Sequence, residues 1–290
     1  MRAALAVLLG GVVAALVAGG ARSQPAMWTV HGGRGEVVLF GSVHLLPPGL
    51  SWRSPALDRV LARAGDIWFE LPISQATDDA ARRLIAREAP LPKGDTLWAH
   101  LAPAQAERVR RAAAEVGLDP DAFTALRPWM AEITLSLAED ARYGARATEG
   151  VEARLQADAP PTARRHALET VRLQVAILAG APLPDQVASL DESAREVIEG
   201  GDLYDRTLRA WLVGDLAQVA HEDLDPLAAA APVVYRRLIV DRNRRWAEIL
   251  SRVARGTRGL TLVVVGAGHL IGPAGVPALL RAQGLAVDGP

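Results

Sequence analysis

Val37-Val38-Leu39-Phe40-Gly41-Ser42-Val43-His44 is an apolar run that ends in glycine and is followed three residues later by histidine. The pattern returns near the C-terminus as Leu262-Val263-Val264-Val265-Gly266-Ala267-Gly268-His269. Valine-rich runs of this length, bounded by glycine, are typical of strands that are buried on both faces of a parallel sheet. Because ligands bind beyond the carboxyl ends of such strands, we expect His44 and His269 to meet at one edge of the sheet.

A further strand is predicted at residues 66–71, and it carries Glu70 at its carboxyl end. The residues before it indicate a helix, with Ser54 as N-cap, Pro55 at the first helical position and Gly65 as C-cap. A strand, a helix and a strand in this order predict a right-handed βαβ unit. Glu70 is therefore expected at the same edge as His44.

Most of the chain between these strands has helical patterns. The expected fold is α/β, with a small mixed central sheet, GxxH motifs at strand ends and a large, mostly helical insertion at roughly residues 75–235. Residues 24–290 are expected to form one domain of this kind. A short strand is predicted at residues 164–168, ending at Glu169, and a long helix at residues 232–255.

Composition excludes several classes of protein. Half of the 290 residues are hydrophobic, which is enough for a sizeable core, and the formal net charge is −1. This charge gives no bulk attraction to nucleic acid, so no nucleic-acid partner is expected. The chain has no cysteine, which excludes disulfides, thiolate nucleophiles and cysteine-ligated zinc.

The N-terminus is typical of a targeting segment. Arg2 precedes an apolar stretch over residues 3–18, and small residues follow at Ala21 and Ser23. This pattern predicts a signal peptide over residues 1–23, cleaved near Ser23, and export to a bacterial periplasm. The alternative is an uncleaved anchor, in which residues 3–20 hold the protein at the inner membrane. Only in that case is a membrane contact expected.

The strand ends bring together two imidazoles and one or two carboxylates, from His44, Glu70, Glu169 and His269. These groups are the ligand set of a hydrolytic divalent metal, and they could equally serve acid–base chemistry without a metal. Glycine is expected to let the chain turn sharply off each strand before the histidine. The histidines could alternatively be structural, and Glu169 could simply cap the helix that begins at Thr170.

Arg242 lies on the apolar stripe of the predicted long helix, between Ile239 and Trp246. A buried arginine is costly unless it is paired. Glu70 or Glu169 would satisfy it in a structural ion pair, and a substrate carbonyl or phosphate would satisfy it in a catalytic role. Both interpretations stay open at this point.

The ordered motifs of the chain resemble those of the TraB/GumN family, which is related to the Tiki proteins. The match extends over nearly the whole chain after the signal peptide. The matching residues are Gly41-Ser-Val-His44, Trp68-Phe-Glu70, Leu91-Pro-Lys-Gly94, Arg127-Pro-Trp129, Gly150-Val-Glu152, Leu168-Glu-Thr170 with Gln174, Gly214-Asp215, Arg242-Asn243 and Gly266-Ala-Gly-His269-Leu-Ile-Gly-Pro273. At Glu152 the family more often has Asp, so that position receives no role.

The resemblance implies a mixed α/β core and, for the Tiki branch, a metal-dependent protease with manganese or cobalt favoured and zinc possible. We therefore expect a periplasmic hydrolase, with a peptide-bond substrate favoured over another small molecule. His44, Glu70 and His269 would hold the metal. Glu70, Arg242 and Glu169 would be the catalytic residues, with Arg242 polarising the carbonyl and Glu169 acting as a supporting acid or general base.

Two other kinds of protein fit the same resemblance. Related folds include a haem-binding lipoprotein, so the chain could bind haem or another ligand without turnover. GumN lies in a gene cluster for an exopolysaccharide, so the chain could be an accessory protein of polysaccharide assembly. The sequence assigns no oligomeric state.

Overall fold

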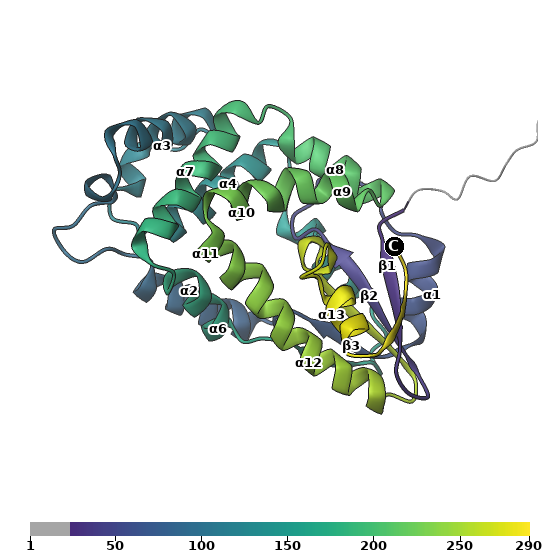
Figure 1. Cartoon of the computed structure of the whole chain (residues 1–290). Coiled ribbons are helices and arrows are strands. Elements are labelled where there is room, and N and C mark those ends of the chain that lie inside the picture. Colours follow the sequence, from purple (N-terminus) through teal and green to yellow (C-terminus); the bar gives the residue numbers. More distant parts are fainter. Residues whose placement is uncertain (1–23) are drawn as a thin grey trace, which may run out of the picture.

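The structure is a computed structural model and describes residues 24–290 (Figure 1). Within these residues, six strands form one mixed sheet in the order β4-β3-β5-β2-β1-β6. The strands are β1 (Met27–His31), β2 (Glu36–Ser42), β3 (Ala64–Phe69), β4 (Arg164–Ala167), β5 (Leu260–Gly266) and β6 (Ala286–Asp288). The predicted signal peptide, residues 1–23, lies outside the described residues.

The central strands are parallel and end at one edge of the sheet. Strand β2 pairs with β5, with Ser42 opposite Gly266. Strand β3 pairs with the other side of β5, with Phe69 opposite Val264. The prediction that the two GxxH motifs leave the sheet at a common edge is therefore confirmed, and Glu70 follows β3 at that edge.

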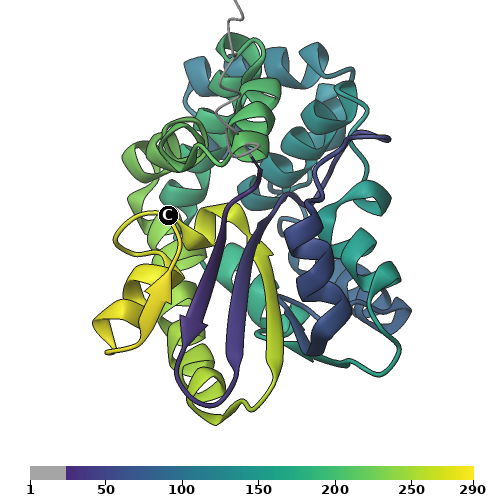
Figure 2. The same ribbon diagram turned by 90° about the vertical axis from the view of Figure 1, so that its right-hand side faces the viewer.

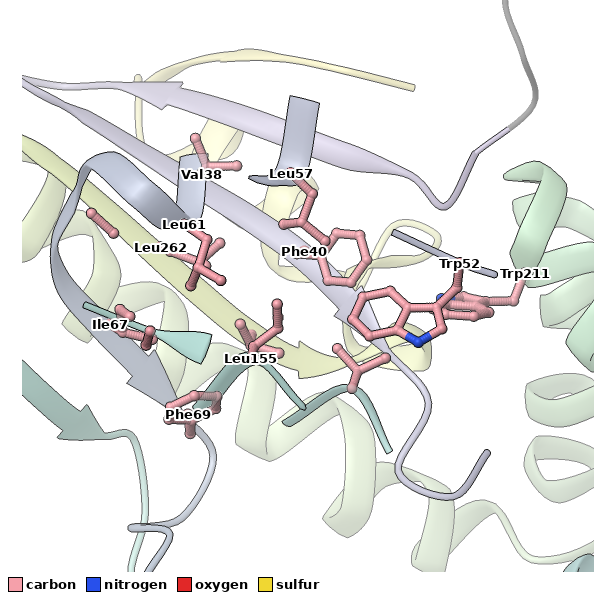
Figure 3. Packing of buried hydrophobic residues seen from close by; sticks show 14 of the residues in the cluster. Val38, Phe40, Trp52, Leu57, Leu61, Ile67, Phe69, Leu155, Trp211 and Leu262 are labelled. Carbon is pink, nitrogen blue, oxygen red and sulfur yellow. The ribbon is translucent and has the colours of Figure 1, made fainter. Parts of the chain in front are cut away.

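The sheet is the middle of three layers. Successive strand residues point to opposite faces, so each face packs against helices of its own. On one face, Phe40 packs with Trp52 and Trp211, and the neighbouring strands add Ile67 and Leu262 (Figure 3). This face is covered by α1 (Pro55–Arg63), α5 (Val151–Asp158) and α8 (Leu203–Val213). The other face is covered by α12 (Asp241–Gly256) and α13 (Val276–Ala282). Burial on both faces explains why β2 and β5 show no polar alternation.

The predicted helical insertion is present between β3 and β5, with β4 as its one described strand. Figure 2 shows many of its helices beyond one end of the sheet, while α5 and α8 also pack on one face of the sheet. Its remaining α-helices are α2 (Gln75–Glu88), α3 (Pro103–Glu115), α4 (Pro128–Arg142), α6 (Val171–Ala179), α7 (Leu183–Glu199), α9 (Leu216–Val219), α10 (Asp225–Ala230) and α11 (Pro232–Tyr235). Helices α3, α4 and α7 share a core of their own around Val109, Leu135 and Leu190. In residues 24–290, no helix is both long and apolar enough to cross a membrane.

Some local predictions were wrong. Gly65 lies inside β3, and α1 ends at Arg63 with Ala64 as its C-cap. The edge strand β1 was missed because residues 27–31 are short and carry no strong apolar run. The predicted long helix is divided by a π-helical segment, Arg236–Val240, between α11 and α12. Such π segments add a residue to one turn, which changes the face that the following residues present.

Candidate functional site

A cavity of about 420 Å³ lies between the carboxyl edge of the sheet and the helical insertion. The sheet contributes Ser42, His44, Gly266 and His269 to its lining. The opposite side comes from α4, α7, α8 and the π-helical segment Ala220–Leu224. Among the predicted site residues, only the two histidines line this cavity. Glu70, Arg242 and Glu169 lie beneath them, in the protein interior.

Three predicted residues converge next to Gly266. A Cβ atom built on this glycine would lie 3.4 Å from Glu70 Oε1, 3.4 Å from His44 Nε2 and 3.6 Å from His269 Cδ2. The Nε2 of His269 is 3.9 Å from Glu70 Oε1. The absence of a side chain at Gly266 therefore leaves a space that is bordered by Glu70 Oε1, His44 Nε2 and the ring edge of His269.

The glycines of the GxxH motifs act differently from the prediction. Gly41 lies inside β2 and Gly266 inside β5, so neither is a turn. A Cβ on Gly41 would lie 3.1 Å from Ala267 Cα, which is tighter than most contacts between carbon atoms. Gly41 thus allows a close approach between the two strand ends, and the chain turns only after each glycine.

Arg242 is the centre of the buried polar cluster. Its Nε donates to Glu169, and its Nη2 donates to Glu70 Oε2 at 2.6 Å and contacts Glu169 Oε2 at 3.0 Å. Its Nη1 contacts Leu238 O at 3.2 Å and His269 Nε2 at 3.0 Å. Hydrogen bonds use four of the five N–H groups of the guanidinium, and Nη2 also forms an ion pair with Glu169. The predicted burial and carboxylate pairing of Arg242 are present, but Arg242 does not line the cavity.

Glu70 is held as a carboxylate. Its Oε1 accepts from the Gly266 backbone N–H at 2.8 Å, and its Oε2 accepts from Arg242 and from Gln174. Burial alone would raise the pKa of Glu70, but the nearby His269, Arg242 and His44 and the Gly266 hydrogen bond lower it to about 2. Glu70 is therefore ionised at all physiological pH values.

Glu169 is the deepest group of the cluster, with no exposed side-chain surface. Beyond Arg242, its Oε1 accepts from Trp246 Nε1 at 3.0 Å. The N-cap of α6 is Thr170, whose hydroxyl accepts from Leu173 N, so the interpretation of Glu169 as the cap is wrong. With its oxygens occupied away from the cavity, Glu169 holds Arg242 in place.

Sequence reasoning missed two residues that hold the histidines. Glu152, at the start of α5, accepts from His44 Nδ1 at 2.8 Å and from Ser42 Oγ. Asn243 Oδ1 lies 2.6 Å from His269 Nδ1. The charge of Glu152 raises the pKa of His44 to about 9, whereas burial lowers the pKa of His269 to about 3. The only signal for either residue was its place in a family motif.

Carboxylates on the insertion were also missed. Glu139, Asp140, Glu196 and Asp223 line the cavity opposite the histidines. Burial, together with the neighbouring acids, raises the pKa of Glu196 to about 7 and that of Asp140 to about 6. The sequence could not single them out because polar residues on helices are usually solvated.

The raised pKa of Glu196 predicts a pH-dependent stability. Its protonated form is favoured in the folded state, so its contribution is complete below about pH 4.5 and is lost as the pH rises through 7. We expect Glu196→Gln to melt above wild type at pH 8, by about 2–4 °C for each kcal/mol gained, and level with it at pH 4.5. Glu199→Gln, at an exposed position of the same helix, is the control. Equal melting differences at both pH values would contradict the prediction.

The donor types at the edge fit a divalent metal, since each histidine has its Nδ1 bound to a supporting side chain. In the structure, these side chains do not form a coordination shell. Within residues 24–290, no three His, Asp or Glu side chains lie close enough to hold a metal ion. Arg242 occupies the Nε2 lone pair of His269. Metal binding through His269 therefore requires Arg242 to give up that one contact, and the metal site stays a prediction.

The geometry defines an α/β protein with a histidine–carboxylate cluster at the carboxyl edge of a mixed sheet and a cavity closed by a helical insertion. The model of the TraB/PrgY/gumN family matches residues 26–288, so the chain belongs to this family. No curated protein and no solved structure was found to match it.

Proposed function

We propose that this chain is an exported, metal-dependent hydrolase and that its favoured substrate is a peptide bond. The observation that carries the proposal is the convergence of His44 Nε2, Glu70 and His269 beside Gly266, at the floor of the cavity. Membership of the TraB/PrgY/gumN family supports the proposal. The family is related to the Tiki proteins, and the resemblance to that branch implies a metal-dependent protease.

His44, Glu70 and His269 would hold the ion, which would supply Lewis acidity and lower the pKa of water toward neutrality. Arg242 is a positioning residue in this scheme, since its donors orient Glu70 and His269. Glu196 lines the same cavity with a pKa of about 7, which suits proton exchange with a bound substrate at neutral pH.

The cavity lining also bears on the substrate. Its described side chains include four carboxylates, with no lysine or arginine, beside apolar groups such as Trp211, Leu208 and Ile239. Like charges placed together in a site of low polarity cost free energy. We therefore expect neutral or cationic peptides to be cleaved in preference to acidic ones.

The test is a peptide-library digest by purified chain 24–290, with cleavage products identified by mass spectrometry. Parallel reactions contain EDTA, Mn²⁺, Co²⁺ or Zn²⁺. We expect cleavage that EDTA abolishes and Mn²⁺ or Co²⁺ restores. Cleavage that persists in EDTA would replace the metal mechanism by acid–base catalysis. No cleavage under any condition, with saturable uptake of haem or another ligand, would identify a binding protein instead.

Export is tested separately because residues 1–23 carry the signal. We expect the native protein purified from its host to begin near Gln24 and to be released with the periplasmic fraction. A native N-terminus at Met1 together with recovery in the membrane fraction would identify the anchored form.

A further inference from the structure

The two cavity histidines are held in the same way by different groups. In each ring Nδ1 contacts one side-chain oxygen, and Nε2 is left on the side of the cavity and Glu70. For His44 the oxygen is Glu152 Oε1 at 2.8 Å, and for His269 it is Asn243 Oδ1 at 2.6 Å. Both holding residues lie on helices, α5 and α12, whereas the histidines follow strands β2 and β5.

The direction of the Asn243 amide is fixed by its second contact. Its Nδ2 donates to the Ala274 carbonyl at 2.9 Å, so the atom that faces His269 is the carbonyl oxygen. An amide oxygen only accepts hydrogen bonds, so His269 Nδ1 must carry the proton. The Nε2 lone pair is then available, and Arg242 Nη1 donates to it at 3.0 Å. The contacts of three residues, Asn243, Ala274 and Arg242, thus agree on one tautomer of His269.

Glu152 imposes the same orientation on His44 with a charged acceptor. Its Oε1 accepts from both Ser42 Oγ and His44 Nδ1, so Nδ1 carries a proton here as well. The backbone fixes this approach: a Cβ on Gly150 would lie 1.9 Å from His44 O, and Val151 N donates to Val43 O. Only glycine at 150 lets the first turn of α5 come this close to the GxxH motif.

We propose that Glu152 and Asn243 are positioning residues: Asn243 sets the Nδ1–H form of His269, and Glu152 holds the Nδ1–H of His44 so that its Nε2 faces the point beside Gly266. The two rings are unlike, because His44 lies beside a carboxylate and His269 beside a neutral amide. The purpose of this arrangement rests on the proposed function, in which both rings would bind one ligand beside Gly266. The tautomers themselves are a property of the chain alone.

The experiment measures the tautomers directly. Chain 24–290 with ¹⁵N-labelled histidine rings is examined by long-range ¹H–¹⁵N correlation NMR, with the six histidines assigned through single His→Gln variants. We expect neutral His269 in the Nδ1–H form, although the side chain of free histidine in water prefers Nε2–H. Asn243→Asp keeps an acceptor and should keep this form, whereas Asn243→Ala should lose it. A wild-type His269 in the Nε2–H form, or an Asn243→Ala spectrum like wild type, would overturn the proposal.

Glu152 gives a second test that does not depend on the buried Asn243. Glu152→Ala should change the His44 ring shifts, and Glu152→Asp should restore them in part. Glu149→Ala, at the neighbouring surface ion pair with Arg154, should leave them unchanged. Equal spectra for wild type and Glu152→Ala would refute the role of Glu152.

Titration with Mn²⁺ alone, followed by calorimetry, separates this proposal from the proposed function. Loss of a side chain that supports a ligand costs about 10–100-fold in metal affinity, so Glu152→Ala should bind Mn²⁺ that much more weakly. If wild type binds no Mn²⁺ while the tautomers are as expected, the metal mechanism fails and the positioning role stands. If wild type binds Mn²⁺ and Glu152→Ala binds it equally, the positioning role of Glu152 fails and the metal site stands.

Discussion

Replacing Arg242 by methionine is expected to destabilise the protein by about 3–5 kcal/mol, the usual cost of removing one partner of a buried ion pair. The side chain is 7 % exposed and compensates two carboxylates, Glu70 and Glu169, of which Glu169 has no exposed surface. Methionine fills a similar volume but leaves both carboxylates with unpaired charge. Arg242→Lys keeps the charge but loses the planar fork that reaches both acids, so it is also expected to be destabilising.

Chemical denaturation of single and double variants measures this effect. Arg245→Met is the matched control, because Arg245 is 43 % exposed and only approaches Glu169 at 3.5 Å. It should change the free energy of unfolding by no more than about 0.5 kcal/mol. Adding Glu169→Gln to Arg242→Met should recover part of the loss, since one buried charge is removed. Equal stabilities of wild type and Arg242→Met would show that Arg242 does not support the cluster.

Replacing His44 by glutamine is expected to reduce hydrolysis by at least about 100-fold while the melting temperature stays close to that of wild type. The His44 side chain is 57 % exposed, toward the cavity, and its one side-chain hydrogen bond is to Glu152. Its loss therefore removes a group that faces the substrate and disturbs little packing. Initial rates on the peptide that wild type cleaves best, with melting curves of both proteins, check this expectation.

The control for His44 is another histidine–carboxylate pair. His100 Nε2 lies 2.8 Å from Asp95 Oδ2, on the insertion and outside the cavity lining. His100→Gln should keep wild-type rates. Full activity in His44→Gln would remove His44 from the proposed mechanism. Glu70→Gln is less informative, because the Gln amide would present N–H groups to either the Gly266 N–H or Arg242, both of which are donors.

The strand ends that carry the site could be predicted from the sequence because they are determined by burial. A strand covered on both faces must be apolar throughout, and this pattern identifies β2 and β5 without any knowledge of their neighbours. The rule that ligands bind at carboxyl ends then places His44, Glu70 and His269 together. The burial and carboxylate pairing of Arg242 followed similarly, from one charged residue on an apolar helical stripe.

The partners of these side chains were decided only by the tertiary structure. Arg242 meets Glu169 across 73 residues and Glu70 across 172, and no local pattern specifies such pairs. Whether the guanidinium has a free donor depends on all of its contacts together. The sequence therefore favoured neither a catalytic nor a structural role for Arg242. The same holds for Glu152 and Asn243, since a hydrogen bond depends on a few ångströms of placement that helix packing sets. The periodicity of apolar residues indicates which faces are buried. Only the folded chain determines which polar atoms then come into contact.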